Sequence, residues 1–329
     1  MATAVNTPTE ASGSATARDQ ATTRTHMVVF AVLLAVLIGA PLAGVYPVFM
    51  MKVMCFALFA CAFNLLLGFG GLLSFGHAMF IGSAGYAAAH SAKVWGFTPE
   101  VAILFATICA GALGWITGML AIRRQGIYFA MITLALAQMV FFFSLQAPFT
   151  HGEDGIQAVP RGKLFGLIDL SQPTAMYIFV LVIFVAGFAL IYRIVHSPFG
   201  QVLQAIRENE PRAISLGYDA DKFKHRAFVL SATLSGLAGG TKAILFQLAS
   251  LTDVHWGMSG EVVLMTLVGG MGTIFGPVVG AAVIVTMQNY LAELGAWVTV
   301  VQGAIFVVCV LVFRRGIVGE IGNLLKKSL

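Results

Sequence analysis

The chain has 329 residues, of which 59% are hydrophobic and only 10% are charged. A soluble domain carries a charge at about a quarter of its positions, so this composition excludes a soluble enzyme. In a soluble protein the formal net charge of +5 would suggest a nucleic-acid partner. Here the basic residues flank apolar runs, so we expect no nucleic-acid partner and predict an all-α polytopic membrane protein embedded in lipid.

Residues 1–25 form an N-terminal segment that is rich in Ala, Thr and Ser. Large apolar side chains are almost absent there, so nothing offsets the entropy of ordering the chain. We expect a disordered cytoplasmic tail. A signal peptide within the first 45 residues is the alternative, but the long polar leader lacks a clear cleavage site between small residues.

Apolar runs long enough to cross a bilayer, about 20 residues each, make residues 26–315 the predicted transmembrane permease domain. Residues 316–329 are the predicted cytoplasmic C-terminal tail. The expected spans cover the ranges 27–45, 49–67, 72–90, 100–122, 127–147, 174–195, 227–248 and 296–313.

Residues 261–290 are also apolar, but glycine and proline interrupt them. We interpret this cluster as the turn of a broken segment and as a candidate gate, because it is denser in glycine than close helix packing requires. Two short spans would give about ten membrane crossings and a re-entrant hairpin about eight; we favour ten. The cluster consists of Gly269, Gly270, Gly272, Gly276 and Pro277.

The distribution of basic residues predicts the orientation. They collect in the N-terminal tail, at Arg123–Arg124, in residues 196–226 and after the last span. The opposite side has only Lys93, Arg161 and Lys163. The positive-inside rule places the basic side in the cytoplasm, so we expect both termini there.

Residues 196–226 form the longest polar stretch in the body of the chain. The run Ser197–Gly200 predicts a turn that leads into a short helix with an apolar stripe. Residues 213–217 predict a second short amphipathic helix. Such helices on a membrane face can dock on a soluble partner; a solvated connector is the alternative.

Several segments resemble LivM-type permeases, which are subunits of bacterial ABC importers for branched-chain amino acids. Together they run from about residue 50 to 320 and are specific in this order. The resemblance implies a multi-pass subunit of the bacterial inner membrane that forms half of a translocation path and performs no covalent chemistry. The segments are Leu73–Ala78 with Gly82 and Tyr86, Gly126–Leu134, residues 196–228, Ser259–Ala281 and Arg315–Ile317.

The resemblance also implies partners: a second, LivH-like permease subunit, two ABC ATPase subunits and a periplasmic substrate-binding protein. The chain has no P-loop, so we expect no cofactor in it, and ATP and Mg²⁺ would be used by the ATPases. These would dock on the coupling loop, residues 196–226. The implied coupling residues are Arg207, Glu208, Asn209, Glu210, Ala213 and Gly217.

The coupling loop departs from the pattern of many ABC importers, Glu-Ala-Ala followed by three residues and Gly. Ala213 and Gly217 match the final Ala and the Gly, but Pro211 and Arg212 occupy the preceding positions.

Polar side chains inside predicted spans are candidates for the translocation path, because polar groups in lipid are costly and usually face a bundle interior or a water-filled route. Hydrogen bonding between helices is the alternative. For Glu261 we favour capping of a helix N-terminus. Polar side chains also lie in or near apolar runs at Lys242, Gln288 and Glu293. The candidates for the path are Asn64, His77, Gln138 and Glu261.

Urea or another small amide, which relatives of the same family carry, is the alternative substrate. An ion-gradient-driven transporter is less consistent with the sequence, because few acidic residues lie deep in a span. The carboxylates of Glu153 and Asp154 lack the further ligands that a metal requires, so we expect neither a metal site nor a catalytic site.

Overall fold

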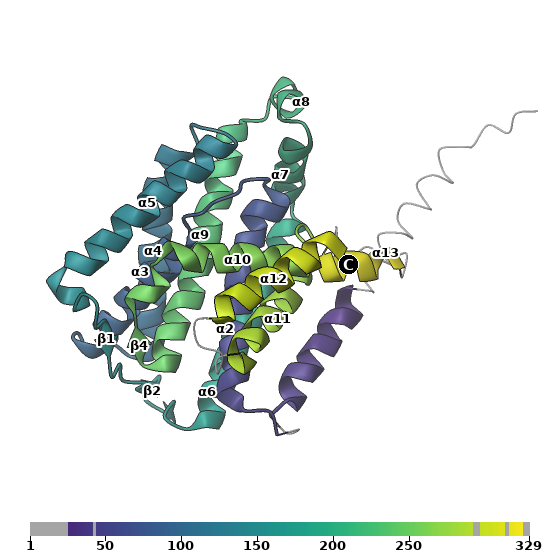
Figure 1. Cartoon of the computed structure of the whole chain (residues 1–329). Helices are drawn as coiled ribbons and strands as arrows, with labels where there is room; N and C mark the ends of the chain where they lie inside the picture. Colours follow the sequence, from purple (N-terminus) through teal and green to yellow (C-terminus); the bar gives the residue numbers. More distant parts are fainter. Residues whose placement is uncertain (1–25, 42–43, 292–296, 313–315, 325–329) are drawn as a thin grey trace, which may run out of the picture.

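The computed structural model describes residues 26–41, 44–291, 297–312 and 316–324. The predicted tail 1–25, the basic pairs Arg314–Arg315 and Lys326–Lys327, and Glu293 lie outside the described residues. Within them the structure is almost entirely helical (Figure 1), which confirms the all-α class. Its four strands, of two residues each, form two small antiparallel pairs.

The helices follow one another in an order close to the predicted one, beginning with the helix His26–Gly39. The others are α2 (Pro47–Asn64), the π-helix η1 (Leu65–Phe69), α3 (His77–Lys93), α4 (Pro99–Ala121), α5 (Ile127–Gln146), η2 (Pro148–Thr150), α6 (Pro173–Val195), α7 (Pro198–Glu208), α8 (Glu210–Ser215), α9 (Ala220–Phe246), η3 (Leu251–Asp253), α10 (Trp256–Gly269), α11 (Gly276–Tyr290), α12 (Trp297–Val312) and α13 (Gly316–Leu324).

Five of these helices are long and apolar enough to cross a membrane: α2 with η1, α4, α5, α6 and α9. The third predicted span begins later than expected, at His77. The reason is a non-helical stretch that opens at Gly71, whose φ of 69° lies in the left-handed region that favours glycine.

The Gly-rich segment is broken as predicted, with the turn at the glycine cluster. Its halves, α10 and α11, have 14 and 15 residues. At 1.5 Å per residue each is about 21–22 Å long, which is short for a hydrocarbon core of about 30 Å. The total number of crossings stays a prediction.

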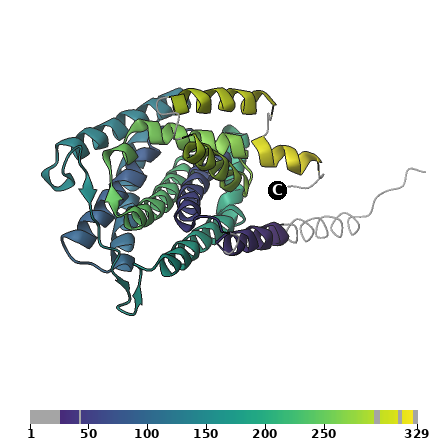
Figure 2. The same ribbon diagram turned by 60° about the horizontal axis from the view of Figure 1, so that its bottom comes forward.

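The centre of the bundle is α2, which packs on α6, α9, α10 and α11. In its most apolar stretch 83% of the residues are buried, against 28% in α5. An all-round apolar helix needs an apolar environment, so α2 is the core helix, whereas most of the α5 surface lies outside the core of this chain. Figure 2 shows α2 enclosed by its neighbours.

Small residues allow α9 to approach its neighbours closely. A Cβ atom added at Gly236 would collide with the side chain of Ala110 in α4, and one at Gly239 would collide with the backbone carbonyl of Ile81 in α3. Such contacts between small residues are typical of helix packing in membranes.

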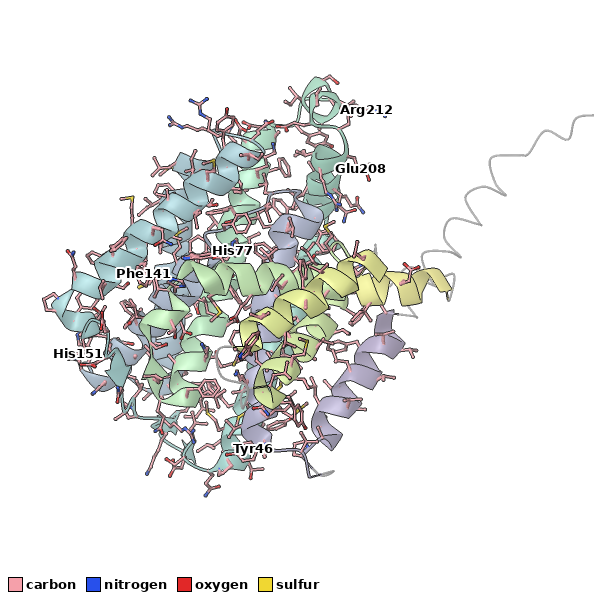
Figure 3. The ribbon with its side chains drawn as sticks, in the orientation of Figure 1. Tyr46, His77, Phe141, His151, Glu208 and Arg212 are labelled. Carbon is pink, nitrogen blue, oxygen red and sulfur yellow. The ribbon has the colours of Figure 1, made fainter. Side chains whose placement is uncertain are left out.

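The two ends of the molecule differ in structure. At one end, uppermost in Figure 1, lie α7 and α8. At the other end, β1 (Ile156–Gln157) pairs with β4 (Leu248–Ala249), and β2 (Lys163–Leu164) pairs with β3 (Ile168–Asp169). Tyr46, just before α2, also lies at this second end (Figure 3).

Candidate functional site

The coupling loop folds into the two predicted helices, α7 and α8. Ser197 caps α7 by accepting a hydrogen bond from the Gly200 N–H at 3.4 Å, and Pro198 occupies the first turn. Asn209 ends α7 and caps α8 through the Arg212 N–H at 3.1 Å. The chain leaves α8 at Gly217, where φ is +91°.

Several predicted coupling residues lie on the exposed tip of this loop. Glu208, Asn209 and Gly217 are exposed, and Figure 3 places Glu208 and the neighbouring Arg212 at the outer end of the molecule. Ala213 is buried against Ile206 and Ala220 instead. It therefore supports the loop from within, and contact between the loop and a partner remains a prediction.

Glu210 binds two side chains outside α8. Its Oε1 accepts from Lys224 Nζ at 2.6 Å and from Gln125 Nε2 at 3.1 Å. These bonds fasten α8 to the start of α9 and to the connection between α4 and α5. The loop is thus anchored on two sides.

Arg207 is exposed, but its guanidinium reaches the end of the central helix. Its Nη1 donates a hydrogen bond to the Gly68 carbonyl in η1. Its aliphatic stem lies so close to Gly71 that a Cβ there would be 2.9 Å from Arg207 Cγ. The coupling loop therefore rests directly on the π-helix that ends the central helix α2. π-helices are rare, and those that occur often lie at functional sites.

Asn64, the last residue of α2 before η1, joins this end of α2 to the turn between α10 and α11. Its Oδ1 accepts from the Gly272 N–H at 3.0 Å, and its Nδ2 donates to the Thr273 carbonyl at 2.8 Å. The side chain is 2% exposed. Asn64, a predicted path residue, thus holds the broken segment to α2, as in the alternative of hydrogen bonding between helices.

The turn is a close crossing of backbones. Gly272 has φ of 81°, and a Cβ on Gly68 would lie 2.6 Å from its nitrogen. A Cβ on Gly269 would collide with the Gly276 carbonyl. The predicted turn and tight crossing are confirmed, whereas a gating role stays a prediction. We call the set Asn64, Gly68, Arg207, Gly272 and Thr273 the junction.

His77, a second predicted path residue, is fully buried between helices (Figure 3). Ser231 donates to the Ala62 carbonyl at 2.5 Å and lies 2.9 Å from His77 Nε2. Since the serine proton is used, Nε2 is the donor in that contact. Nδ1 lies 3.1 Å from the Ser74 hydroxyl. His77 therefore cross-links α3 and α9.

The other two path candidates are partly accessible. Gln138 is half-buried on α5. The capping prediction for Glu261 is wrong: α10 begins at Trp256, with His255 accepting from the Gly257 N–H. Glu261 lies in the second turn, half-buried.

Two lysines inside membrane helices lie close to one another. Lys242 of α9 forms a salt bridge with Asp253 of η3, and Lys242 Nζ and Lys52 Nζ of α2 lie 5.1 and 6.0 Å from the centre of the Phe56 ring. Lys52 was missed, although a lone charge in an apolar run is a visible signal.

The comparisons with known proteins identify the family. Residues 45–310 match the model described as branched-chain amino acid transport system / permease component. The chain belongs to this family. Its members are transport components rather than catalysts, and the match and the apolar helices together make the chain a multi-pass membrane permease.

Individual relatives agree with this assignment. The chain is 24% identical to the high-affinity branched-chain amino acid transport system permease protein LivM of Salmonella typhimurium, over 80% of this chain and 68% of that protein. It is 25% identical to LivM of Escherichia coli over the same shares. It is 29% identical to the ribose import permease protein RbsC of Bacillus subtilis, over 68% of this chain and 70% of that protein. No solved structure matches the chain.

Proposed function

We propose that this chain is the transmembrane permease subunit of an ATP-driven ABC importer for branched-chain or related amino acids and forms half of the translocation path. The observation that carries the proposal is the family match over residues 45–310, together with the LivM relatives. The chain would perform no covalent chemistry itself.

The orientation follows from the charges. Arg123, Arg124 and the basic residues of the coupling loop collect at the end that carries α7 and α8. The positive-inside rule makes this the cytoplasmic end of a protein in the bacterial inner membrane. Both termini would then be cytoplasmic.

The partners would be a second, LivH-like permease subunit, two ABC ATPase subunits and a periplasmic substrate-binding protein. ATP and Mg²⁺ would be used by the ATPases, which would dock on the exposed tip of the coupling loop. The substrate-binding protein would approach the opposite end, where the two strand pairs lie.

The junction offers a physical route for the energy of ATP hydrolysis. A displaced α7 would carry Arg207 with it, and Arg207 is bonded to η1. Asn64, one residue before η1, is bonded to the turn between α10 and α11. Movement of the loop would therefore reach both the central helix and the broken segment.

Urea or another small amide is the alternative substrate within the family. Such a molecule carries no charged group, whereas the membrane helices of this chain contain charges that lack an ionic partner among the described residues. We therefore favour an amino acid. The ion-gradient-driven class is disfavoured because the matched family is a different one.

The direct test is co-purification. The full chain is co-expressed with candidate ATPase, second-permease and binding-protein genes, with and without deletion of residues 201–217. We expect the ATPases to be lost on deletion while the second permease is retained. An intact chain that transports solute alone in vesicles, without an ATPase, would overturn the proposal.

A further inference from the structure

A hollow with basic walls lies between the end of α4 and the start of α9. Its volume is about 320 Å³, and ligand-binding clefts have volumes of about 300–1,000 Å³. The two helices pack along each other. The hydrogen bond from Gln125 Nε2 to Glu210 Oε1 places this end of α4 beside α8, so the hollow adjoins the coupling loop without being part of its exposed tip.

The hollow carries positive charge that the chain does not neutralise. Arg123, Lys222 and Arg226 line it, against the single carboxylate of Asp221. Lys222 is paired with Asp219 at 2.8 Å. Among the described residues, no carboxylate lies within ion-pair distance of Arg123 or Arg226, and neither guanidinium makes a hydrogen bond. Both arginines are exposed and are therefore available to an anion; their planar donor groups suit phosphate.

A polar atom in the wall of the hollow is left unsatisfied by the chain. His225 lines the hollow and packs against α4 at Gly118, where an added Cβ would lie 3.0 Å from His225 Nδ1. Its other ring nitrogen, Nε2, is enclosed and has no hydrogen-bond partner among the described residues. A buried polar atom without a partner lowers stability. Its retention in a residue that lines the hollow is consistent with an occupant that the chain alone lacks.

The surface next to the hollow indicates a lipid as the occupant. Met119 lines the hollow and is 42% exposed. Trp115 and Ile116, one turn earlier on the same face of α4, are also exposed. A basic hollow that opens onto an apolar helix face matches the phosphate and the acyl chains of a phospholipid. A soluble anion or an acidic protein surface would leave the apolar part uncovered.

We propose that this hollow binds the phosphate of an anionic phospholipid from the surrounding bilayer. Arg123 and Arg226 donate hydrogen bonds to the phosphate oxygens, and the acyl chains lie along Met119 and the exposed face of α4. Asp221 accepts a hydrogen bond from a headgroup hydroxyl. The lipid thereby joins α4 to the start of α9. This inference goes beyond the proposed import function and does not depend on it, because it requires only a chain embedded in a membrane.

The test measures lipid binding to the purified full chain in detergent by native mass spectrometry. The probe is phosphatidylglycerol, and phosphatidylcholine, which has no net charge, is the comparison. We expect one phosphatidylglycerol to bind more tightly than phosphatidylcholine. Arg123→Gln and Arg226→Gln should each weaken its binding about tenfold, the loss expected for one charge-assisted hydrogen bond.

The matched control is Arg124→Gln. It removes the same charge from the neighbouring exposed position, which is not among the residues that line the hollow, so phosphatidylglycerol should bind almost as tightly as to the unmodified chain. Thermal unfolding gives a second measurement, because a ligand that binds the folded state stabilises it. Phosphatidylglycerol should raise the melting temperature of the control more than that of the Arg123 and Arg226 variants.

Three results would overturn the site. The first is equal affinity of the unmodified chain for the two lipids. The second is equal binding by all three arginine variants, which would leave only a general attraction between the basic end and anionic lipid. The third is displacement of phosphatidylglycerol by inorganic phosphate at constant ionic strength, which would assign the hollow to a soluble anion.

Discussion

The two ends of the central helix α2 are held in opposite ways. At the end near η1, neutral hydrogen bonds join Asn64 to the backbone of the turn between α10 and α11, and the glycines bring the backbones into contact. Toward the other end, Lys52 shares the Phe56 ring with Lys242 and has no ionic partner among the described residues. A satisfied, close-packed junction suits the transmission of movement, whereas unpaired charges suit a ligand that comes and goes.

The largest expected effect comes from filling the junction. Gly68→Ala places a Cβ 2.6 Å from the Gly272 nitrogen and against Asn64. Overpacking costs about 1–3 kcal/mol or more, and here the neighbour is backbone, so we expect a large fall in the melting temperature of the purified complex. Gly260→Ala is the control, because a Cβ there meets nothing within 4 Å. Equal stability of the two variants would mean that the junction is loose.

Removal of the Asn64 amide should have the next largest effect. Asn64→Leu leaves the Gly272 N–H and the Thr273 carbonyl without these partners. An unsatisfied buried group costs about 1–3 kcal/mol; Gly272 and Thr273 are only half-buried, so each loss is at most of this size. We expect thermal unfolding at lower temperature than for Gln138→Leu, a similar change at a half-buried position on α5. If Asn64 lines a water-filled path instead, the two variants will melt alike.

A smaller effect is expected at His77. Ser231→Ala removes the acceptor of the His77 Nε2 proton and leaves a buried donor unpaired, at a cost of about 1–3 kcal/mol. Ser235→Ala is the matched control: it is equally buried on the same helix, but its hydroxyl bonds only to the Ser231 carbonyl one turn earlier. A stability loss no greater than that of the control would contradict the cross-link.

The smallest effect concerns the start of α9. Hydrogen bonds from the Lys222 side chain and from its backbone N–H lower the pKa of Asp219. A carboxyl whose pKa is lowered on folding contributes stability above its unfolded pKa and loses it as the pH falls through the folded value. Asp219→Asn should therefore flatten the acid limb of the stability curve below about pH 4, measured by thermal unfolding. An unchanged acid limb would contradict this role.

Local features of the fold could be predicted from the sequence. Pro198 marks the start of α7, Gly217 marks the end of α8, and the glycine cluster marks the turn between α10 and α11. Each signal is contained within a few neighbouring residues, where turn and capping preferences act directly.

Contacts between distant segments could not be predicted in this way. Arg207 and Gly68 are 139 positions apart, and Asn64 and Gly272 are 208 apart. From the sequence, Arg207, Asn64 and Gly272 were candidates for three different roles: coupling, the path and the gate. In the structure they meet at the junction. Only tertiary packing brings them together.

The error at Glu261 has a similar origin. The prediction placed Glu261 at a helix start because the apolar region, residues 261–290, begins there. In the structure Ser259 is buried within α10, and its hydroxyl accepts from the Ala78 N–H at 2.8 Å. This bond to α3 satisfies the hydroxyl inside the bundle and allows the helix to begin earlier.

The most direct test of the account is ATP-driven leucine uptake by complexes that carry Arg207→Met. The variant removes the hydrogen bond between α7 and η1 and leaves the exposed tip of the coupling loop intact. We predict that the ATPases still bind and hydrolyse ATP, while leucine uptake per ATP falls about tenfold. Arg124→Met, an exposed arginine at the same end, should leave this ratio unchanged. Equal uptake per ATP in the two variants would contradict coupling through the junction.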